Sequence, residues 1–186
     1  MLNLFYPYEY ADSVFSIDYQ KLYDKGYRGL IFDIDNTLVH HGEDSTPEVD
    51  ALFRQIHQVG LKTVLLSNNS EKRILRFLQN IDSGYIAEAN KPETAGYEKA
   101  IRMLDLPKDQ CICIGDQLFT DIYGANKYGI TSILVKYLRY PDEKKIGIRR
   151  SIEKVVLKCY HMSRSCRGRL GDIYLEEAQT DAADQR

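Results

Sequence analysis

Residues 28–39, Arg-Gly-Leu-Ile-Phe-Asp-Ile-Asp-Asn-Thr-Leu-Val, decide the fold that we expect. The apolar run at 30–32 is typical of a short strand buried in a parallel sheet that is covered on both faces. Asp33 and Asp35 follow this run directly, at the end of the strand where open α/β sheets usually bind ligands. Two carboxylates at that place repel each other, and a divalent cation would relieve the repulsion. The simpler interpretation of the stretch is a strand that ends in an acidic turn.

Further along the chain, short apolar runs alternate with segments of helical periodicity. Alternating strands and helices predict right-handed βαβ units and a three-layer α/β domain, in which about five parallel strands lie between two layers of helices. After the first strand we expect strands at 63–66, 85–86, 111–114 and 132–135, and helices at 47–59, from 71 onward, at 94–104 and at 119–127.

Length and composition are those of one soluble globular domain. The chain has 186 residues, of which 44% are hydrophobic and 28% charged. No stretch approaches the roughly 18 apolar residues of a membrane span, and residues 1–10 lack the pattern of a signal peptide. The four cysteines are irregularly spaced, and Cys111 and Cys113 alternate in an apolar run, so we expect buried thiols rather than a disulfide framework. We therefore expect a protein of the reducing cytosol.

Composition divides the chain into four parts. Residues 1–27 contain eight aromatic side chains, and we expect this segment to pack on the sheet edge or over the domain. Residues 28–136 hold the strands and helices of the core. Residues 137–169 form a strongly basic extension, since 136–169 contains eleven Lys and Arg against three acids. Residues 170–186 form an acidic tail that we expect to be disordered.

The basic extension contains a candidate amphipathic helix. Its apolar residues follow helical spacing, and four basic residues lie on its other faces; the apolar set is Ile148, Ile152, Val155, Val156, Cys159 and Met162, and the basic set is Arg149, Arg150, Lys154 and Lys158. Such a helix can lie on an anionic membrane as a peripheral contact, or it can pack its apolar stripe on the domain and leave its charges in solvent. Nucleic-acid binding also suits the charge, but no recognised motif favours it.

Polar residues follow the later strands as well. Ser67 and Asn68 come after the second strand, Lys91 after the third, and Asp116 after the fourth, with Asp121 five residues further on. Each has an ordinary explanation as part of a turn or surface, but together at one edge of a sheet they form a coherent phosphate site. The loop after the first strand also holds His40 and His41, whose role the sequence leaves open.

The order of these motifs resembles that of the haloacid dehalogenase (HAD) superfamily. The matching segments are Asp-Ile-Asp-Asn-Thr at 33–37, Ser67, Lys91-Pro92 and Gly-Asp-Gln-Leu-Phe-Thr-Asp at 115–121, so the resemblance spans residue 28 to about residue 135. It implies a HAD-like fold and a phosphatase that binds Mg²⁺ and a phosphorylated substrate.

The resemblance implies roles for the acids. Asp33 would attack phosphorus and form an aspartyl-phosphate. Asp35 would protonate the leaving oxygen and then activate water, which requires surroundings that favour its proton when substrate is bound. Mg²⁺ would be held by the carboxylate of Asp33, the backbone carbonyl of Asp35 and the carboxylate of Asp116, with Asp121 as an outer ligand or as a partner of the motif lysine.

The same resemblance implies how the phosphoryl group is held. Ser67 and the backbone N–H groups after it, with Asn68, would bind the phosphoryl oxygens, and Lys91 would neutralise their charge. Thr37 would support the loop or touch phosphate.

Short intervals between the motifs bear on the substrate. Only 29 residues separate Thr37 from Ser67, and 23 separate Ser67 from Lys91, which leaves no room for a cap domain. The site should be open, as in the capless subclass III enzymes, which act on large or surface-bound phosphates or borrow a neighbouring subunit as a lid. The oligomeric state stays open.

The whole chain looks like the YqeG-type group of subclass IIIA phosphatases, which is similar to the phosphatidylglycerophosphate phosphatases. This resemblance implies hydrolysis of the terminal phosphate of phosphatidylglycerophosphate, in phospholipid metabolism. An open site beside a basic helix would suit a lipid headgroup at a bilayer, so we expect a cytoplasmic protein that can contact the membrane surface. Two alternatives remain: a phosphatase of a soluble sugar phosphate or nucleotide, and a non-catalytic RNA- or ribosome-associated binding protein on the same fold.

Overall fold

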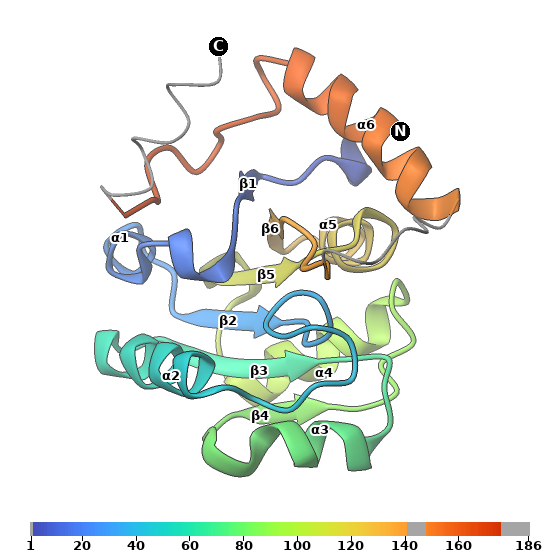
Figure 1. Ribbon diagram of the computed structural model, residues 1–186. Helices are drawn as coiled ribbons and strands as arrows, with labels where there is room; N and C mark the ends of the chain where they lie inside the picture. Colours follow the sequence, from blue (N-terminus) through green and yellow to red (C-terminus); the bar gives the residue numbers. More distant parts are fainter. Residues whose placement is uncertain (1, 141–147, 176–186) are drawn as a thin grey trace.

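The computed structural model describes residues 2–140 and 148–175. Its centre is a parallel sheet of six strands in the order β1-β6-β5-β2-β3-β4 (Figure 1). The strands are β1 (Glu9–Ala11), β2 (Gly29–Phe32), β3 (Lys62–Leu66), β4 (Gly84–Ile86), β5 (Cys111–Gly115) and β6 (Thr131–Val135). The predicted parallel sheet is therefore confirmed.

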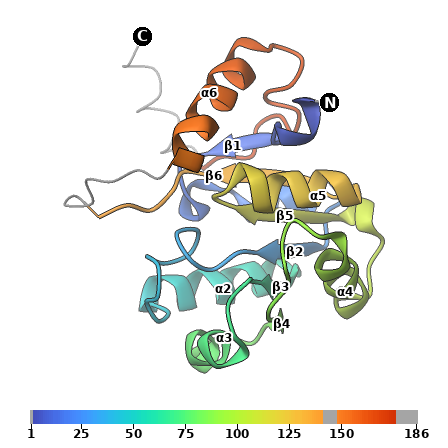
Figure 2. The same cartoon turned by 90° about the vertical axis from the view of Figure 1, so that its right-hand side faces the viewer.

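Helices cover both faces of this sheet (Figure 2). On one face lie α1 (Tyr19–Asp24), α2 (Pro47–Val59) and α3 (Glu71–Phe77), and on the other lie α4 (Thr94–Leu104) and α5 (Tyr123–Tyr128). Each face has its own cluster of buried apolar side chains. Helix α6 (Ile148–Met162) lies next to β1 and β6, the two outermost strands on one side of the sheet. The three-layer α/β architecture is as predicted.

Strand β2 occupies the middle of the sheet, and all four of its residues are buried. Its last residue, Phe32, pairs with Leu65 of β3 and Ile114 of β5. This register brings the carboxyl ends of the three strands to one edge. The backbone N–H of Asp33 continues the pairing, since it donates to the carbonyl oxygen of Ile114 over 3.0 Å.

Local signals explain where the helices begin. The side chain of Thr46 accepts a hydrogen bond from the N–H of Val49, and Pro47 occupies the first turn of α2, as predicted. Gly60 ends this helix in a left-handed conformation, with φ of 97°. Helix α3 also begins after the expected residue, Ser70, but the Ser70 side chain makes no capping hydrogen bond.

The sheet has one strand more than the five that we expected. The sixth is β1, which belongs to the aromatic N-terminal segment and pairs in parallel with β6. Its three residues lack the apolar run that marks the other strands. The predicted helix at 119–127 also begins differently, as a π-helical turn at Leu118–Ile122 that leads into α5. Helix α3 buries Ile74 and Phe77, whereas Leu75 is 50% exposed.

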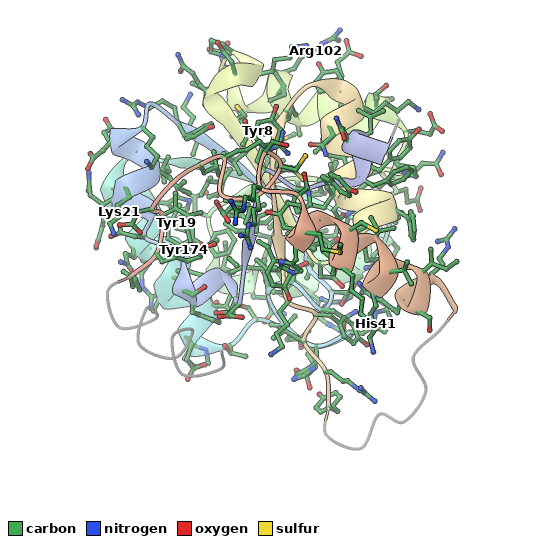
Figure 3. The ribbon with its side chains drawn as sticks, turned by 90° about the horizontal axis from the view of Figure 1, so that it is seen from above. Tyr8, Tyr19, Lys21, His41, Arg102 and Tyr174 are labelled. Atoms are coloured by element: carbon green, nitrogen blue, oxygen red, sulfur yellow. The ribbon has the colours of Figure 1, made fainter. Side chains whose placement is uncertain are left out.

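Part of the predicted acidic tail is packed against the domain. Leu170 and Ile173 are buried, and the N–H of Asp18 donates to the carbonyl oxygen of Ile173 over 2.8 Å. Lys21 Nζ donates to the carbonyl oxygen of Tyr174 over 2.8 Å, and Figure 3 shows these two residues side by side. The expectation of disorder is therefore wrong for residues 170–175, while residues 176–186 lie outside the described part of the chain.

The face of helix α6 that packs on the domain is not the apolar stripe that we predicted. Val156 and Leu157 pack against a buried cluster of Leu118, Ile122 and Leu134, and Tyr160 is also buried. Most of the predicted stripe faces solvent instead: Ile152, Val155 and Met162 are 49%, 61% and 83% exposed, and Cys159 is exposed too. The side chain of Ile148 is not among the described ones. Within residues 2–140 and 148–175, no helix is long and apolar enough to cross a bilayer.

Candidate active site

The predicted lysine and two of the predicted aspartates meet at the carboxyl edge of the sheet. Lys91 Nζ lies 2.6 Å from Oδ1 of Asp33 and 2.6 Å from Oδ1 of Asp121. All three residues are buried. Asp121 is therefore a partner of Lys91, and its predicted role as an outer metal ligand stays a prediction.

Asp116 completes an acidic cluster with the other two aspartates. Carboxylate oxygens of Asp33, Asp116 and Asp121 lie within 4.8 Å of one another. Thr37 joins two of them, because its Oγ1 lies 3.2 Å from Oδ2 of Asp33 and 3.2 Å from Oδ1 of Asp116. Thr37 is 2% exposed, so we expect it to hold the two carboxylates in place rather than to contact substrate.

Burial and mutual repulsion disturb the ionisation of this cluster. Burial is the main cause that raises the pKa of Asp33 to about 6, with Lys91 opposing the change and Asp121 adding to it. Burial, followed by the charges of Asp33 and Asp121, raises the pKa of Asp116 to about 8. Three carboxylates thus share two basic partners among the described residues, Lys91 and, at Asp116, Arg150. Three convergent, buried carboxylates fit a hard divalent cation such as Mg²⁺.

Lys91 keeps its positive charge in this setting. Burial by itself opposes the charged form, but the carboxylates of Asp121 and Asp33 outweigh it and raise the pKa of Lys91 above its ordinary value. A fixed cation therefore lies beside Asp33 at the base of the site.

The carboxylate of Asp35 has hydrogen-bond partners of its own outside the acidic cluster. Its Oδ1 accepts hydrogen bonds from the N–H of Gly42 over 2.8 Å and from Arg73 Nη2 over 3.0 Å, and its Oδ2 accepts one from Asn69 Nδ2. All three partners donate, so they fix the orientation of the Asp35 side chain through both of its oxygens. The predicted proton on Asp35 in the presence of substrate stays a prediction.

Ser67 and Asn68 organise the loop that follows β3. Ser67 Oγ accepts hydrogen bonds from the backbone N–H of Asn69 over 3.2 Å and from its side-chain amide over 3.1 Å. Asn68 Oδ1 accepts from the N–H of Lys91 over 2.6 Å, and Asn68 Nδ2 donates to the carbonyl oxygen of Lys91 over 3.2 Å. The Asn68 side chain thus fixes the backbone of Lys91.

A cavity of about 170 Å³ opens onto these residues. Its lining includes five of the eight predicted site residues together with neighbouring loop residues: Asp33, Asp35, Asn36, His41, Ser67, Asn68, Asn69, Lys91, Gln117 and Thr120. This volume suits a phosphate group rather than a whole metabolite. The loop residue His41, labelled in Figure 3, lines the cavity and is largely exposed. The other loop histidine, His40, stacks on the ring of Tyr140.

The backbone of Gly115 lies close to the side chain of Asp121, which brings Asp121 near the neighbouring Asp116. A Cβ atom on Gly115 would lie 2.5 Å from Cβ of Asp121, so only glycine fits at this end of β5. The π-helical turn then directs Asp121 inward, and Tyr97 Oη donates to the carbonyl oxygens of Thr120 and Asp121 over 3.0 and 3.1 Å. Such turns occur frequently at functional sites.

Several side chains that contact the aspartates of the site were not predicted as functional. Asn69 and Arg73 hold Asp35, and Arg150 from α6 contacts Asp116. Asn69 could have been predicted, because it directly follows Asn68 in the loop after β3. Arg73 and Arg150 carry no local signal, because each resembles an ordinary basic residue on the surface of a helix.

Comparison with known proteins gives a consistent result. A family model described as HAD-hydrolase-like matches residues 88–145. Probable phosphatase YqeG of Bacillus subtilis (strain 168) is 33% identical over 156 residues, which cover 83% of this chain and 91% of that protein. Chloroplastic phosphatidylglycerophosphate phosphatase 1 of Chlamydomonas reinhardtii is 26% identical over 151 residues, which cover 76% of this chain and 56% of that protein.

A solved structure agrees with the fold. An uncharacterized protein from Listeria monocytogenes serotype 4b matches with a TM-score of 0.51 and 17% identity, over 70% of this chain and 97% of that one. At this identity the likeness supports the architecture alone.

Proposed function

Because the chain belongs to the HAD-like hydrolases, in the same family as the YqeG protein, we propose that it is a Mg²⁺-dependent phosphatase that works through an aspartyl-phosphate on Asp33. One observation carries this proposal: Asp33 lies buried at the base of a cavity, between a lysine and a second acidic group. A carboxylate in this position can attack phosphorus while the positive charge beside it offsets the charge of the incoming phosphate.

The first step transfers the phosphoryl group to the protein. An oxygen of Asp33 forms a bond to phosphorus as the bond between phosphorus and the leaving oxygen breaks, and Asp35 supplies a proton to that leaving oxygen. Lys91 offsets the charge on the phosphoryl oxygens, and Ser67 with the following loop holds them. Preorganised positive charge and donors of this kind supply most of the catalysis in phosphoryl transfer.

The second step restores Asp33. Asp35 takes a proton from a water molecule, whose oxygen attacks phosphorus as the bond to Asp33 breaks, and inorganic phosphate leaves. The contacts of Asp35 with Gly42, Asn69 and Arg73 hold its carboxylate in place to accept that proton.

Asp33 and Asp116 would hold Mg²⁺ through their carboxylates, with the backbone carbonyl of Asp35, and Asp121 would stay with Lys91. The bound ion would orient the phosphoryl oxygens and neutralise charge that develops on them.

We further propose a lipid phosphomonoester as the substrate, with phosphatidylglycerophosphate as the first candidate. The similarity to the Chlamydomonas enzyme supports this choice. So does the small cavity. Residues 38–66 and 68–90, the two described intervals that could hold a cap domain, contain only α2, β3, α3, a 3₁₀ turn at Leu78–Asn80, β4 and loops. A phosphate at a bilayer surface needs no enclosing cap.

The exposed face of α6 fits the same proposal. Ile152, Val155 and Met162 form an exposed apolar stripe, and Lys154 and Lys158 are exposed beside it. Such a face can insert its apolar side chains at the boundary of an anionic bilayer, where each Lys or Arg contributes about 1 kcal/mol. The protein would then be cytoplasmic and peripheral at the membrane surface.

A first experiment tests the chemistry. Release of phosphate from a generic aryl phosphate should require Mg²⁺ and should be lost in Asp33→Asn, while Asp109→Asn, a change at an exposed aspartate outside the site, should leave it intact. Activity that survives in Asp33→Asn would remove the nucleophile assignment. A wild-type protein that hydrolyses nothing would favour a binding role on this fold.

A second experiment tests the substrate. Phosphate release should be faster with phosphatidylglycerophosphate in anionic vesicles than with sugar phosphates or nucleotides. Val155→Asp should weaken vesicle binding, whereas Met103→Asp, at a methionine on α4 that is 50% exposed, should not. If soluble phosphomonoesters are preferred and vesicles do not bind the protein, the lipid assignment is wrong and the phosphatase assignment stands.

A further inference from the structure

Arg150 of α6 reaches Asp116 from outside the cavity. Its Nη1 donates to the backbone carbonyl oxygen of Asp116 over 2.7 Å, and its Nη2 donates to Oδ2 of the same residue. The guanidinium therefore contacts both the main chain and the side chain of one aspartate. Such two-point contacts fix orientation as well as charge.

The two carboxylate oxygens of Asp116 face different partners. Oδ1 lies 3.2 Å from Thr37 Oγ1, which is also 3.2 Å from Oδ2 of Asp33. Oδ2 is the oxygen that Arg150 contacts. Oδ1 is thus connected to Asp33 through Thr37, while Arg150 binds the other oxygen of Asp116.

Several contacts hold Arg150 in this position. Glu153, one turn further along α6, accepts from Arg150 Nη1 over 2.9 Å and from the N–H of Leu118 over 3.0 Å. Glu153 is 6% exposed, and the ring of Tyr137 lies 4.3 Å from Cζ of Arg150. Glu153 therefore connects Arg150 and α6 to the turn that follows β5.

We propose that Arg150 is a positioning residue: it holds Asp116 with Oδ1 directed at the metal position, so α6 belongs to the catalytic unit. This inference rests on the proposed Mg²⁺-dependent function. Groups that orient a metal ligand from behind commonly account for a factor of about 10 to 100 in metal affinity. The opposite relation, in which Arg150 competes with the ion for Asp116, predicts an effect of opposite sign.

Calorimetric titration of the full-length protein with Mg²⁺, without substrate, tests the proposal. Arg150→Met should weaken Mg²⁺ binding by about 10- to 100-fold. Arg149→Met removes the same charge from the exposed neighbouring position and should leave the affinity at the wild-type value. Unchanged or tighter Mg²⁺ binding in Arg150→Met would overturn the proposal, and tighter binding would show competition.

A second variant and a second readout guard against misfolding. Arg150→Lys keeps the charge but loses the two-point contact, so it should also weaken Mg²⁺ binding, though less than Arg150→Met does. Wild-type affinity in Arg150→Lys would overturn the positioning role. With aryl phosphate as substrate, both variants should raise the Mg²⁺ concentration needed for half-maximal rate, while kcat at saturating Mg²⁺ changes little.

The same titration separates this inference from the proposed function. If wild-type protein binds Mg²⁺ and Asp116→Asn abolishes binding, the metal assignment stands, and a normal Arg150→Met then refutes only the role of Arg150. If wild-type protein binds no Mg²⁺ at all, the proposed function itself fails.

Discussion

Lys91 Nζ lies 2.6 Å from Oδ1 of Asp33, and the two side chains are only 4% and 10% exposed. The residues are separated by 58 positions in the chain, and the parallel sheet brings them together. A buried charge without its partner is costly, so each of these side chains depends on the other.

Lys91→Met should abolish activity and destabilise the fold. The change removes the cation that offsets phosphate charge, so kcat for an aryl phosphate should fall by about 100-fold or more. It also leaves Asp33 and Asp121 without their partner, so the free energy of unfolding should fall by about 3–5 kcal/mol. Steady-state kinetics and urea unfolding in EDTA measure the two effects.

A double mutant checks the cause of the lost stability. Adding Asp33→Asn to Lys91→Met should recover part of the stability, because one uncompensated charge is removed. If the two changes destabilise the protein additively, the ion pair does not contribute as described.

Stability of the metal-free protein should fall as pH rises from about 4 to 8. Unfolded aspartates titrate near pH 4, whereas burial raises the folded pKa to about 6 for Asp33 and about 8 for Asp116. In that window the folded protein binds more protons than the unfolded chain, so the stability present at low pH is lost as the two groups ionise. Thermal unfolding in EDTA at several pH values measures this slope.

Mg²⁺ should reverse the trend. The ion binds deprotonated carboxylates, so its stabilising effect should be larger at pH 8 than at pH 5. Asp116→Asn should flatten the slope in EDTA and remove most of the response to Mg²⁺. A stability that is independent of pH in EDTA would contradict the charge crowding that we infer for the cluster.

The sequence predicted the sheet and most of the site because both rest on local patterns. An apolar run followed by Asp33 and Asp35 marks a strand and its carboxyl end, and the same holds for Asp116. The strand β1 was missed because its pairing with β6 depends on residues more than a hundred positions away. Periodicity also misplaced the buried face of α6, where the polar Glu153 packs inward and Val155 faces solvent.

The contacts of Arg73 and Arg150 could not be predicted for a related reason. Each arginine lies on a helix surface in sequence terms, and its partner comes from a distant strand end. Long side chains of this kind are placed by tertiary packing and not by local propensity.

Arg73→Lys should lower kcat with little change in KM. Lysine keeps the charge, but its shorter side chain would not hold the contact that Arg73 Nη2 makes with Oδ1 of Asp35. Asp35 would then lose its fixed orientation, at a cost of about 10-fold in rate. Arg102→Lys on α4 is the matched control, because Arg102 pairs with the exposed Glu98 and, among the described residues, has no hydrogen bond or ion pair with the site. Equal effects of the two changes on kcat would show that Arg73 has no particular role in orienting Asp35.

Gly115→Ala should impair both stability and catalysis. The new Cβ would lie 2.5 Å from Cβ and Cγ of Asp121, which is fully buried and has no room to retreat. We expect a loss of about 1–3 kcal/mol in the free energy of unfolding from this overpacking. Because Asp121 Oδ1 also binds Lys91, we expect kcat to fall by about 10-fold as that lysine loses its alignment.

The control for this change is Gly84→Ala on β4. There the new Cβ would meet the thioether of Met103, a flexible side chain that is 50% exposed and can move aside. Urea unfolding and aryl phosphate kinetics on both variants separate a general intolerance of alanine in the sheet from a specific effect on Asp121. A Gly115→Ala protein with normal kcat would show that the position of Asp121 does not set the alignment of Lys91.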